Sequence, residues 1–212
     1  MSLIPTIAPT PDSYFVVGVD EVGRGPLAGP VCAAAVVLPQ GFSSSEINDS
    51  KQLSAPKREY LSELIQQEAV AWAVVSVGHR RIGTINIRNA TKLAMSLAVR
   101  RVVTRSQPKV GAIELVRIDG NMLIDTNLQQ ETVIGGDAKH LEIAAASILA
   151  KVYRDRLMQV LDLKYPGYRL GRHAGYPTSE HRAAIAALGP SKVHRATFRG
   201  VKEHLRAREV ST

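Results

Sequence analysis

The chain has 212 residues and a formal net charge of +8, from 27 lysines and arginines and 19 aspartates and glutamates. This length fits one domain with a buried core, and an apolar fraction of 45% excludes wholesale disorder. The single cysteine, Cys32, excludes an intrachain disulfide framework and a cysteine-based metal site. The positive charge fits a polyanionic partner, but solvated helix faces would account for it equally well.

The predicted elements alternate between strands and helices along the chain. Apolar, β-branched runs predict five strands, at residues 14–19, 31–38, 71–77, 112–118 and 131–134. Helical periodicity predicts four helices, at residues 57–68 (capped by Ser54), 86–103, 139–163 and 179–188. The first two strands are close enough for a hairpin. The order indicates an α/β or α+β sheet with helices packed on its faces.

The N-terminal segment and the cellular setting can be predicted as well. Residues 1–13 contain three prolines and lack the basic and apolar regions of a signal peptide, so we expect a flexible N-terminal tail. The sequence contains no uninterrupted run of about 18 apolar residues, the length needed for a transmembrane helix. We therefore expect a cytoplasmic protein, monomeric and without a membrane partner.

Carboxylates follow three of the apolar runs, each next to a glycine-bearing turn. Asp20 and Glu21 end the first strand before Gly23, Asp119 ends the fourth, and Asp137 lies between a short strand and a long helix. Functional side chains gather at strand ends in such sheets. Adjacent Asp20 and Glu21 point to opposite faces of a regular strand, so they converge only if the chain bends there.

Converging carboxylates repel one another and are kept together by a counter-charge. Ligands made only of oxygen favour hard ions such as Mg²⁺ or Mn²⁺, and such sites catalyse phosphoryl chemistry. Each acid also has a simpler interpretation. Asp137 could be the N-cap of its helix, and Asp119 could be a turn residue. The acids together, in a basic chain, favour a metal-dependent nuclease.

The same residues resemble the sequence signature of the type 2 ribonucleases H, in particular bacterial ribonuclease HII. The most specific block is residues 20–30, which include Gly23-Arg24-Gly25. Further similar blocks follow in the family's order, at residues 48–51, 118–121, 136–137, 143–151, 154–155, 165–168, 173, 175–178 and 188–191. The resemblance extends from about residue 14 to residue 198, nearly the whole chain.

This resemblance implies an α/β ribonuclease H-like fold, with a central mixed five-stranded sheet flanked by helices. It implies a catalytic domain over residues 14–165 and a C-terminal helical, substrate-binding part over residues 166–212. Asp20, Glu21, Asp119 and Asp137 match the family's metal-binding catalytic carboxylates, so Mn²⁺ or Mg²⁺ is the implied cofactor. Asp155 matches a further acid near the metals.

The resemblance also assigns substrate contacts. The motif Gly23-Arg24-Gly25 matches the residues that read the 2′-hydroxyl at an RNA–DNA junction, and Tyr176 matches a tyrosine that stacks beside it. Lys51 and Ser147 match positions that contact the phosphate backbone. Glycines permit the close backbone approach that reading a ribose requires. Read without the resemblance, Gly-Arg-Gly could be an ordinary turn, and Tyr176 a packed surface residue.

The implied enzyme is an endonuclease for RNA–DNA hybrids and for duplex DNA with embedded ribonucleotides, leaving 5′-phosphate and 3′-hydroxyl ends. Two alternatives are a non-catalytic nucleic-acid-binding domain and another nuclease or integrase on the same fold. The chain departs from many relatives at residues 139–142, where a serine-rich stretch is common, and at Ala174, where a basic residue is common. These departures bear on substrate contacts and leave the four carboxylates untouched.

Overall fold

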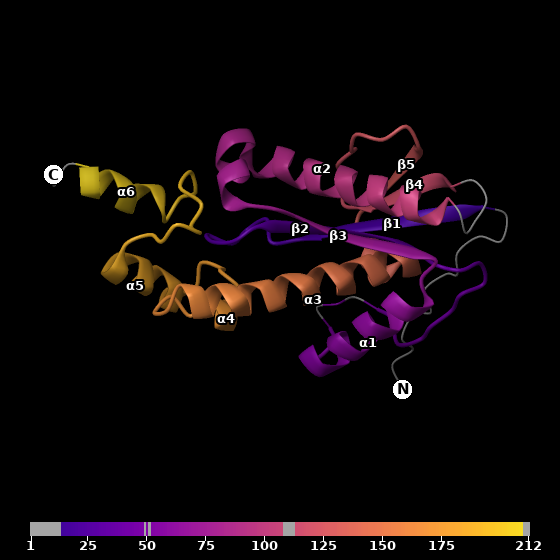
Figure 1. The fold of residues 1–212 in the computed structure, drawn as a ribbon, viewed down its shortest axis with the longest axis horizontal. Coiled ribbons are helices and arrows are strands. Elements are labelled where there is room, and N and C mark those ends of the chain that lie inside the picture. Colours follow the sequence, from indigo (N-terminus) through magenta and orange to yellow (C-terminus); the bar gives the residue numbers. More distant parts are fainter. Residues whose placement is uncertain (1–13, 49, 51, 108–112, 210–212) are drawn as a thin grey trace.

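A computed structural model of the protein describes residues 14–48, 50, 52–107 and 113–209 (Figure 1). The tail predicted for residues 1–13 and the proposed phosphate-binding Lys51 lie outside the described residues. No helix in the described ranges is long and apolar enough to span a membrane.

A mixed five-stranded sheet forms the centre of the fold. Its order is β3-β2-β1-β4-β5, with β1 and β2 antiparallel, β2 and β3 antiparallel, and β4 parallel to both β1 and β5. The predicted hairpin of the first two strands is therefore confirmed. The strand bounds are β1 Phe15–Val22, β2 Val31–Val37, β3 Ala71–Val77, β4 Ile113–Asp119 and β5 Gln129–Val133. The first strand continues three residues beyond its predicted end.

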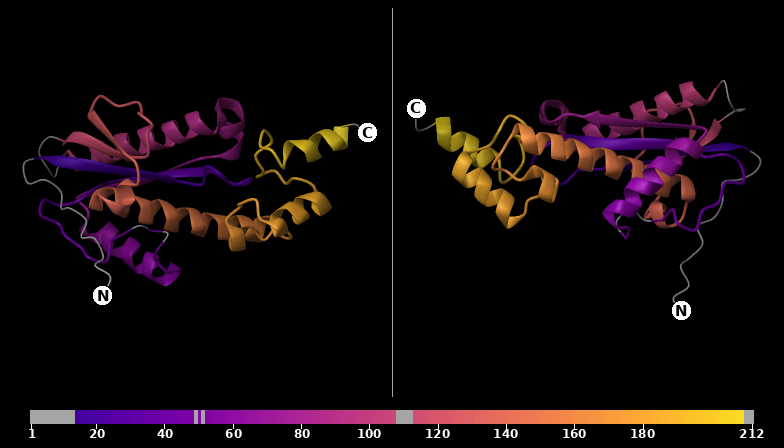
Figure 2. Two further views of the ribbon diagram at one scale, coloured as in Figure 1. Left: turned by 180° about the vertical axis from the view of Figure 1, so that it is seen from behind. Right: turned by 60° about the horizontal axis from the view of Figure 1, so that its bottom comes forward.

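Helices cover both faces of the sheet (Figures 1 and 2). Helix α2 (His79–Ser106) lies on one face, and α1 (Ala55–Glu68) and α3 (Leu141–Lys164) lie on the other. Ser54 caps α1 as predicted, accepting a hydrogen bond from the backbone N–H of Lys57. The remaining helical elements are η1 (Gly136–Ala138), α4 (Leu170–His173), α5 (Ser179–Leu188) and α6 (Lys202–Glu209).

The short elements η1 and α4 were not predicted, and two longer helices also differ from the prediction. Helix α2 begins at His79, and the predicted start at Asn86 is a break inside it, where φ is 64° and ψ is 167°. The Asn86 side chain accepts a hydrogen bond from the Asn89 N–H, so it caps the second part of the helix. Helix α6 forms in a segment whose basic residues carry no apolar helical period, which is why periodicity missed it.

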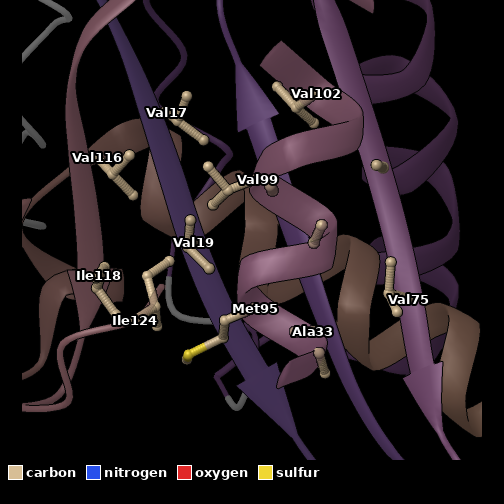
Figure 3. Packing of buried hydrophobic residues seen from close by; sticks show 14 of the residues in the cluster. Val17, Val19, Ala33, Val75, Met95, Val99, Val102, Val116, Ile118 and Ile124 are labelled. Carbon is tan, nitrogen blue, oxygen red and sulfur yellow. The ribbon is translucent and has the colours of Figure 1, made fainter. Parts of the chain in front are cut away.

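Alternation along the strands divides the core into two layers. Val17 and Val19 pack toward α2 (Figure 3), and neighbouring positions face α3. At Gly18, a Cβ atom would lie 2.2 Å from the backbone carbonyl carbon of Glu142, so α3 contacts β1 at its backbone. This close packing fixes α3 against the strand that carries Asp20.

A third apolar cluster connects the loop after β1 to the C-terminal segment. It contains Leu27 and Ala28 from that loop, Met158 from α3, and Tyr168, Leu170, Ile185, Val193 and Val201. Three backbone hydrogen bonds reinforce it: Leu27 N–H to Gly175 O, Gly29 N–H to Val193 O, and Arg195 N–H to Leu27 O, at 2.8–3.0 Å. This cluster contains residues from both sides of the predicted division after residue 165. That division into two parts stays a prediction.

Candidate active site

A cavity of about 350 Å³ lies at the ends of β1 and β4. Its walls combine three acids, the glycine-bearing loop after β1, two residues of α3 and one tyrosine. The lining residues are Asp20, Glu21, Val22, Gly23, Arg24, Gly25, Ser50, Asp119, Ser147, Lys151 and Tyr176. Most of the predicted site residues within the described ranges are therefore brought together.

The sheet itself brings the acids to this cavity. Strands β1 and β4 are parallel neighbours, so Asp20 and Asp119 lie at the same sheet edge. Asp20 shares the α3 face with Gly18, and alternation turns Glu21 to the other face. Both nevertheless line the cavity, because it opens at the end of the sheet. The expected bend comes after Val22, at Gly23, where φ is +90°.

Asp20 is the most deeply buried of the three acids, with 6% of its surface exposed. One oxygen accepts a hydrogen bond from the Glu21 N–H at 2.7 Å, and the Ser147 hydroxyl also donates to the carboxylate. Burial raises the pKa of Asp20 well above its ordinary value, and the charges of Glu21 and Asp119 raise it further. The negative charges in this cavity oppose one another.

Glu21 lies in a less enclosed position and pairs with Arg24. The guanidinium donates to its carboxylate at 3.3 Å, with the Arg24 side chain 48% exposed. Burial raises the pKa of Glu21, and Arg24 partly offsets this. An exposed pair of this length stabilises weakly, so Arg24 is available to a substrate.

Asp119 is the last residue of β4, and Asp137 lies in η1. An Asp119 carboxylate oxygen accepts a hydrogen bond from the Gly136 N–H at 2.7 Å, which holds η1 at the end of β4. Asp137 follows Gly136 and is buried, but it is not among the lining residues. The N-cap of α3 is His140, so the alternative interpretation of Asp137 as that N-cap is wrong.

A second wall of the cavity is formed by the glycine loop (residues 23–25) and Tyr176. A Cβ atom on Gly25 would lie 3.6 Å from Cε1 of Tyr176, so the two face one another across a short gap. A Cβ atom on Gly23 would lie 2.1 Å from Nε of Arg154, a fully buried side chain. Gly23 is thus required by its positive φ and by Arg154 behind it.

Two polar lining residues, Ser50 and Lys151, had no assigned role in the sequence prediction. Ser50 and Ser147 share a hydrogen bond of 2.9 Å between their hydroxyl oxygens. Lys151 follows Ser147 by four residues on α3, a spacing that puts both on one helix face and could have identified it. Its ammonium donates to Asp155 at 2.7 Å, and Asp155 itself does not line the cavity.

The donor set of the cavity fits a hard divalent cation. All three acids offer oxygen, and their mutual repulsion would be relieved by positive charge. In the ranges that the structure describes, no three His, Cys, Asp or Glu side chains are grouped closely enough to hold one metal ion. Metal binding would therefore draw the carboxylates closer together.

Comparison with solved structures first defines the fold. Ribonuclease H2 from Pyrococcus horikoshii OT3 matches with a TM-score of 0.75 at 22% identity, over 92% of this chain and 99% of that chain. Bst-RNase HIII in complex with Mn²⁺ matches with a TM-score of 0.67 at 20% identity, over 93% and 71%. The fold is the ribonuclease H-like fold, as predicted.

Sequence comparison then identifies the family. The family model described as Ribonuclease HII matches residues 17–201. Ribonuclease HII of Geobacter metallireducens is 50% identical over 192 residues, which cover 91% of this chain and 87% of that protein. The chain belongs to the ribonuclease HII family. It is a ribonuclease H, an endonuclease that acts on the RNA of RNA–DNA hybrids.

Proposed function

We propose that this enzyme cleaves hybrids and single ribonucleotides embedded in duplex DNA by metal-dependent hydrolysis, leaving 5′-phosphate and 3′-hydroxyl ends. The observation that carries the proposal is a single cavity lined by Asp20, Glu21 and Asp119 and by a glycine loop and a tyrosine. The charges of Glu21 and Asp119 disfavour ionisation of Asp20. Primer removal and ribonucleotide excision are the biological settings that such an activity would serve.

The carboxylates Asp20, Glu21, Asp119 and Asp137 would hold Mg²⁺ or Mn²⁺. Bound divalent ions supply an activated water and charge stabilisation for in-line displacement at phosphorus. The Mn²⁺ complex of Bst-RNase HIII, which shares the fold, makes Mn²⁺ a natural first ion to test. The hydrogen bonds from Ser147 to Asp20 and from Gly136 to Asp119 orient these two acids toward the cavity.

The wall formed by residues 23–25 and Tyr176 would select the substrate. Arg24 and its flanking glycines would read the 2′-hydroxyl, which distinguishes RNA from DNA. Tyr176 is 41% exposed, which leaves its ring free to stack on the sugar–base step next to the junction. Stacking of this kind contributes about 1–3 kcal/mol per base.

Cationic and hydroxyl groups around the cavity would hold the phosphate backbone. Lys51 and Ser147 are the proposed contacts, although Ser147 is mostly buried and its hydroxyl is engaged with Asp20. Lys151 also lines the cavity, and its ammonium is better suited than the Ser147 hydroxyl to contact a phosphate. Asp155 would act on the site through its ion pair with Lys151.

One assay tests the proposal against its alternatives. A DNA duplex with one ribonucleotide is incubated with the protein in chelator, in Mg²⁺ and in Mn²⁺, and the ends are mapped. We expect a single cut at the ribonucleotide with metal and none in chelator. No cleavage in any condition would favour a binding domain, whereas cuts independent of the ribonucleotide would favour another nuclease on this fold.

A further inference from the structure

The dipeptide His194-Arg195 lies where the C-terminal segment meets the glycine loop. His194 forms an isolated antiparallel bridge with Ala28, and the Arg195 N–H donates to Leu27 O at 2.8 Å. Both side chains are buried, with 4% and 0% of their surface exposed. The side chain of Arg195 contacts the glycine loop, and that of His194 is connected to Tyr176 through His181. These are the two halves of the second cavity wall.

Arg195 holds the backbone of the glycine loop from behind. Its guanidinium donates to Gly23 O at 2.6 Å and Arg24 O at 2.8 Å, and its Nε donates to Gly29 O at 3.0 Å. The guanidinium also lies 5.0 Å from the centre of the Phe198 ring. The planar guanidinium spreads its donors over three nitrogens and so reaches carbonyls at separate positions, whereas the three N–H bonds of a lysine ammonium all leave from one nitrogen.

The guanidinium has no carboxylate partner among the residues that the structure describes, so these carbonyls are what compensates its burial. Burial and, to a lesser extent, the charge of the neighbouring Arg154 together lower the pKa of Arg195 to about 9. The group therefore keeps its charge at neutral pH. Arg154 reinforces the same loop region, donating to Pro30 O and Ala28 O and, across to the C-terminal segment, to Ala174 O.

His194 reaches the other half of the wall through His181. The Ser191 N–H can only donate, so Nδ1 of His194 is the acceptor of that 3.0 Å bond. Nε2 of His194 then carries the proton and donates to Nε2 of His181 at 3.1 Å. His181 in turn donates from Nδ1 to Tyr176 O at 2.9 Å. Both rings are neutral in this arrangement, and each bond has one donor and one acceptor.

Two further contacts hold the histidine chain in place. The His173 ring stacks on His181 with ring centres 4.4 Å apart, and the Tyr176 N–H donates to His173 O at 2.9 Å. The backbone of Tyr176 is thus fixed at both its N–H and its carbonyl. Its ring stays exposed toward Gly25.

We propose that His194 and Arg195 are positioning residues that set the distance between the glycine loop and Tyr176, and so determine selectivity for a single ribonucleotide. The proposal rests on the proposed substrate contacts of residues 23–25 and Tyr176. Neighbouring residues in one backbone segment cannot shift independently, so Arg195 and His194 transmit any displacement of one half of the wall to the other.

The two substrates respond differently to a loosened wall. A lone ribonucleotide offers one register in which the 2′-hydroxyl and the stacked step are both correctly placed. A continuous hybrid offers a 2′-hydroxyl in every register, so a displaced wall still finds one. Misplacement of about 1 Å can lower a rate by up to 100-fold. Loss of positioning should therefore depress cleavage of the lone ribonucleotide more than cleavage of the hybrid.

The first experiment compares Arg195→Lys with Ile185→Ala. Ile185 is fully buried in the same C-terminal cluster, but its aliphatic side chain cannot hydrogen-bond to the loop. We expect Arg195→Lys to lower kcat/KM for the lone ribonucleotide about tenfold more than for the hybrid. Ile185→Ala should lower both equally. Equal ratios for the two variants, with both proteins folded by thermal denaturation, would overturn the role of Arg195.

The second experiment is a double-mutant cycle between His181 and Tyr176. His181→Leu removes the side-chain donor to Tyr176 O and leaves only the Thr178 N–H, which donates at 2.8 Å. His181→Asn retains a side-chain N–H near the Nδ1 position and should restore part of the selectivity. In a Tyr176→Ala background, His181→Leu should have little additional effect, because the histidines act through Tyr176. Additive effects in the cycle would mean that the histidines serve only the core.

These outcomes are separable from failure of the proposed function. If Tyr176→Ala alone cleaves the lone ribonucleotide at the wild-type rate, the substrate contact of Tyr176 is wrong. If Tyr176→Ala is impaired while Arg195→Lys and His181→Leu are not, the contact stands and the positioning proposal is overturned.

Discussion

The two walls of the cavity are held together in opposite ways. On the carboxylate wall, the charges of Glu21 and Asp119 raise the pKa of Asp20, and the charge of Asp119 raises the pKa of Glu21. On the second wall, buried cationic and neutral groups satisfy the backbone carbonyls behind residues 23–25 and Tyr176. A bound cation would stabilise the first wall by relieving this repulsion, whereas the groups of the second wall already satisfy one another.

Under the proposed function, this difference would separate chemistry from recognition within one small site. The groups proposed to respond to a metal and a developing charge are electrostatically unfavourable as they stand. Groups that must report the shape of a substrate are instead fixed by hydrogen bonds to the backbone. We expect mutations in the two walls to have different signatures in activity and in stability.

The largest effect is expected on the carboxylate wall. Asp20→Asn and Asp119→Asn should each lower the cleavage rate by at least about 100-fold, in line with removal of electrostatic stabilisation from a transition state. Rates are measured on a lone-ribonucleotide duplex in Mn²⁺ and in Mg²⁺. Normal cleavage by Asp119→Asn would make Asp119 a turn residue and would remove it from the active site.

The same variants provide a stability control. In chelator, Asp20→Asn should unfold at a higher temperature than the wild type, because it removes a buried charge repelled by Glu21 and Asp119. A lower midpoint would mean that the hydrogen bonds of the Asp20 carboxylate outweigh the repulsion.

The next largest effect is expected on the second wall, at Gly23. Gly23→Val forces a side chain into the space of Arg154 Nε at a positive φ, so we expect loss of both thermal stability and activity. Gly25→Ala is the matched control, because its Cβ atom meets only the Tyr176 ring at ordinary contact distance. It should fold normally and affect substrate selectivity alone. A Gly23→Val protein as stable as Gly25→Ala would contradict this account.

Gly23 also shows how far the sequence could predict the site. The motif identified the residue, but a glycine beside a carboxylate pair suggested space for a ribose. The actual neighbour, Arg154, is 131 residues away along the chain, and no local pattern links the two. The strands, most helices and the gathering of Asp20, Glu21 and Asp119 were predictable, because periodicity and strand ends are local features.

What escaped prediction depends on long-range packing. Helix α6 contains a single large apolar residue, Leu205, and the partners of Arg195 and His194 come from the loop after β1 and from α5. In the sequence, both residues are simply part of a basic C-terminal end. Lys151 is the exception, because its spacing from Ser147 on one helix would have placed it at the cavity.

The smallest expected effect is a contrast in the pH dependence of stability. Asp20 has a folded pKa above its ordinary value of 3.8, so the folded protein binds this proton more tightly than the unfolded chain does. Its stabilising contribution is therefore fully present below that ordinary value. The contribution is lost as the pH rises through the raised folded pKa.

His194 behaves in the opposite sense. Burial, followed by the charges of His181, His79 and His173, lowers its pKa from 6.5 to about 4. The neutral ring is favoured in the folded state, so its contribution is present above pH 6.5 and is lost as the pH falls through about 4. A shift of this size corresponds to about 3 kcal/mol.

The two walls can therefore be distinguished by unfolding midpoints measured in chelator between about pH 4 and pH 8, since their ionisable groups titrate in opposite directions. Relative to wild type, Asp20→Asn should gain stability as the pH rises. His194→Gln should be destabilised most near neutral pH and should approach wild type in acid, where the wild-type imidazole must be protonated. Parallel pH profiles for wild type and both variants would mean that neither group titrates with folding, and the electrostatic contrast between the walls would then be wrong.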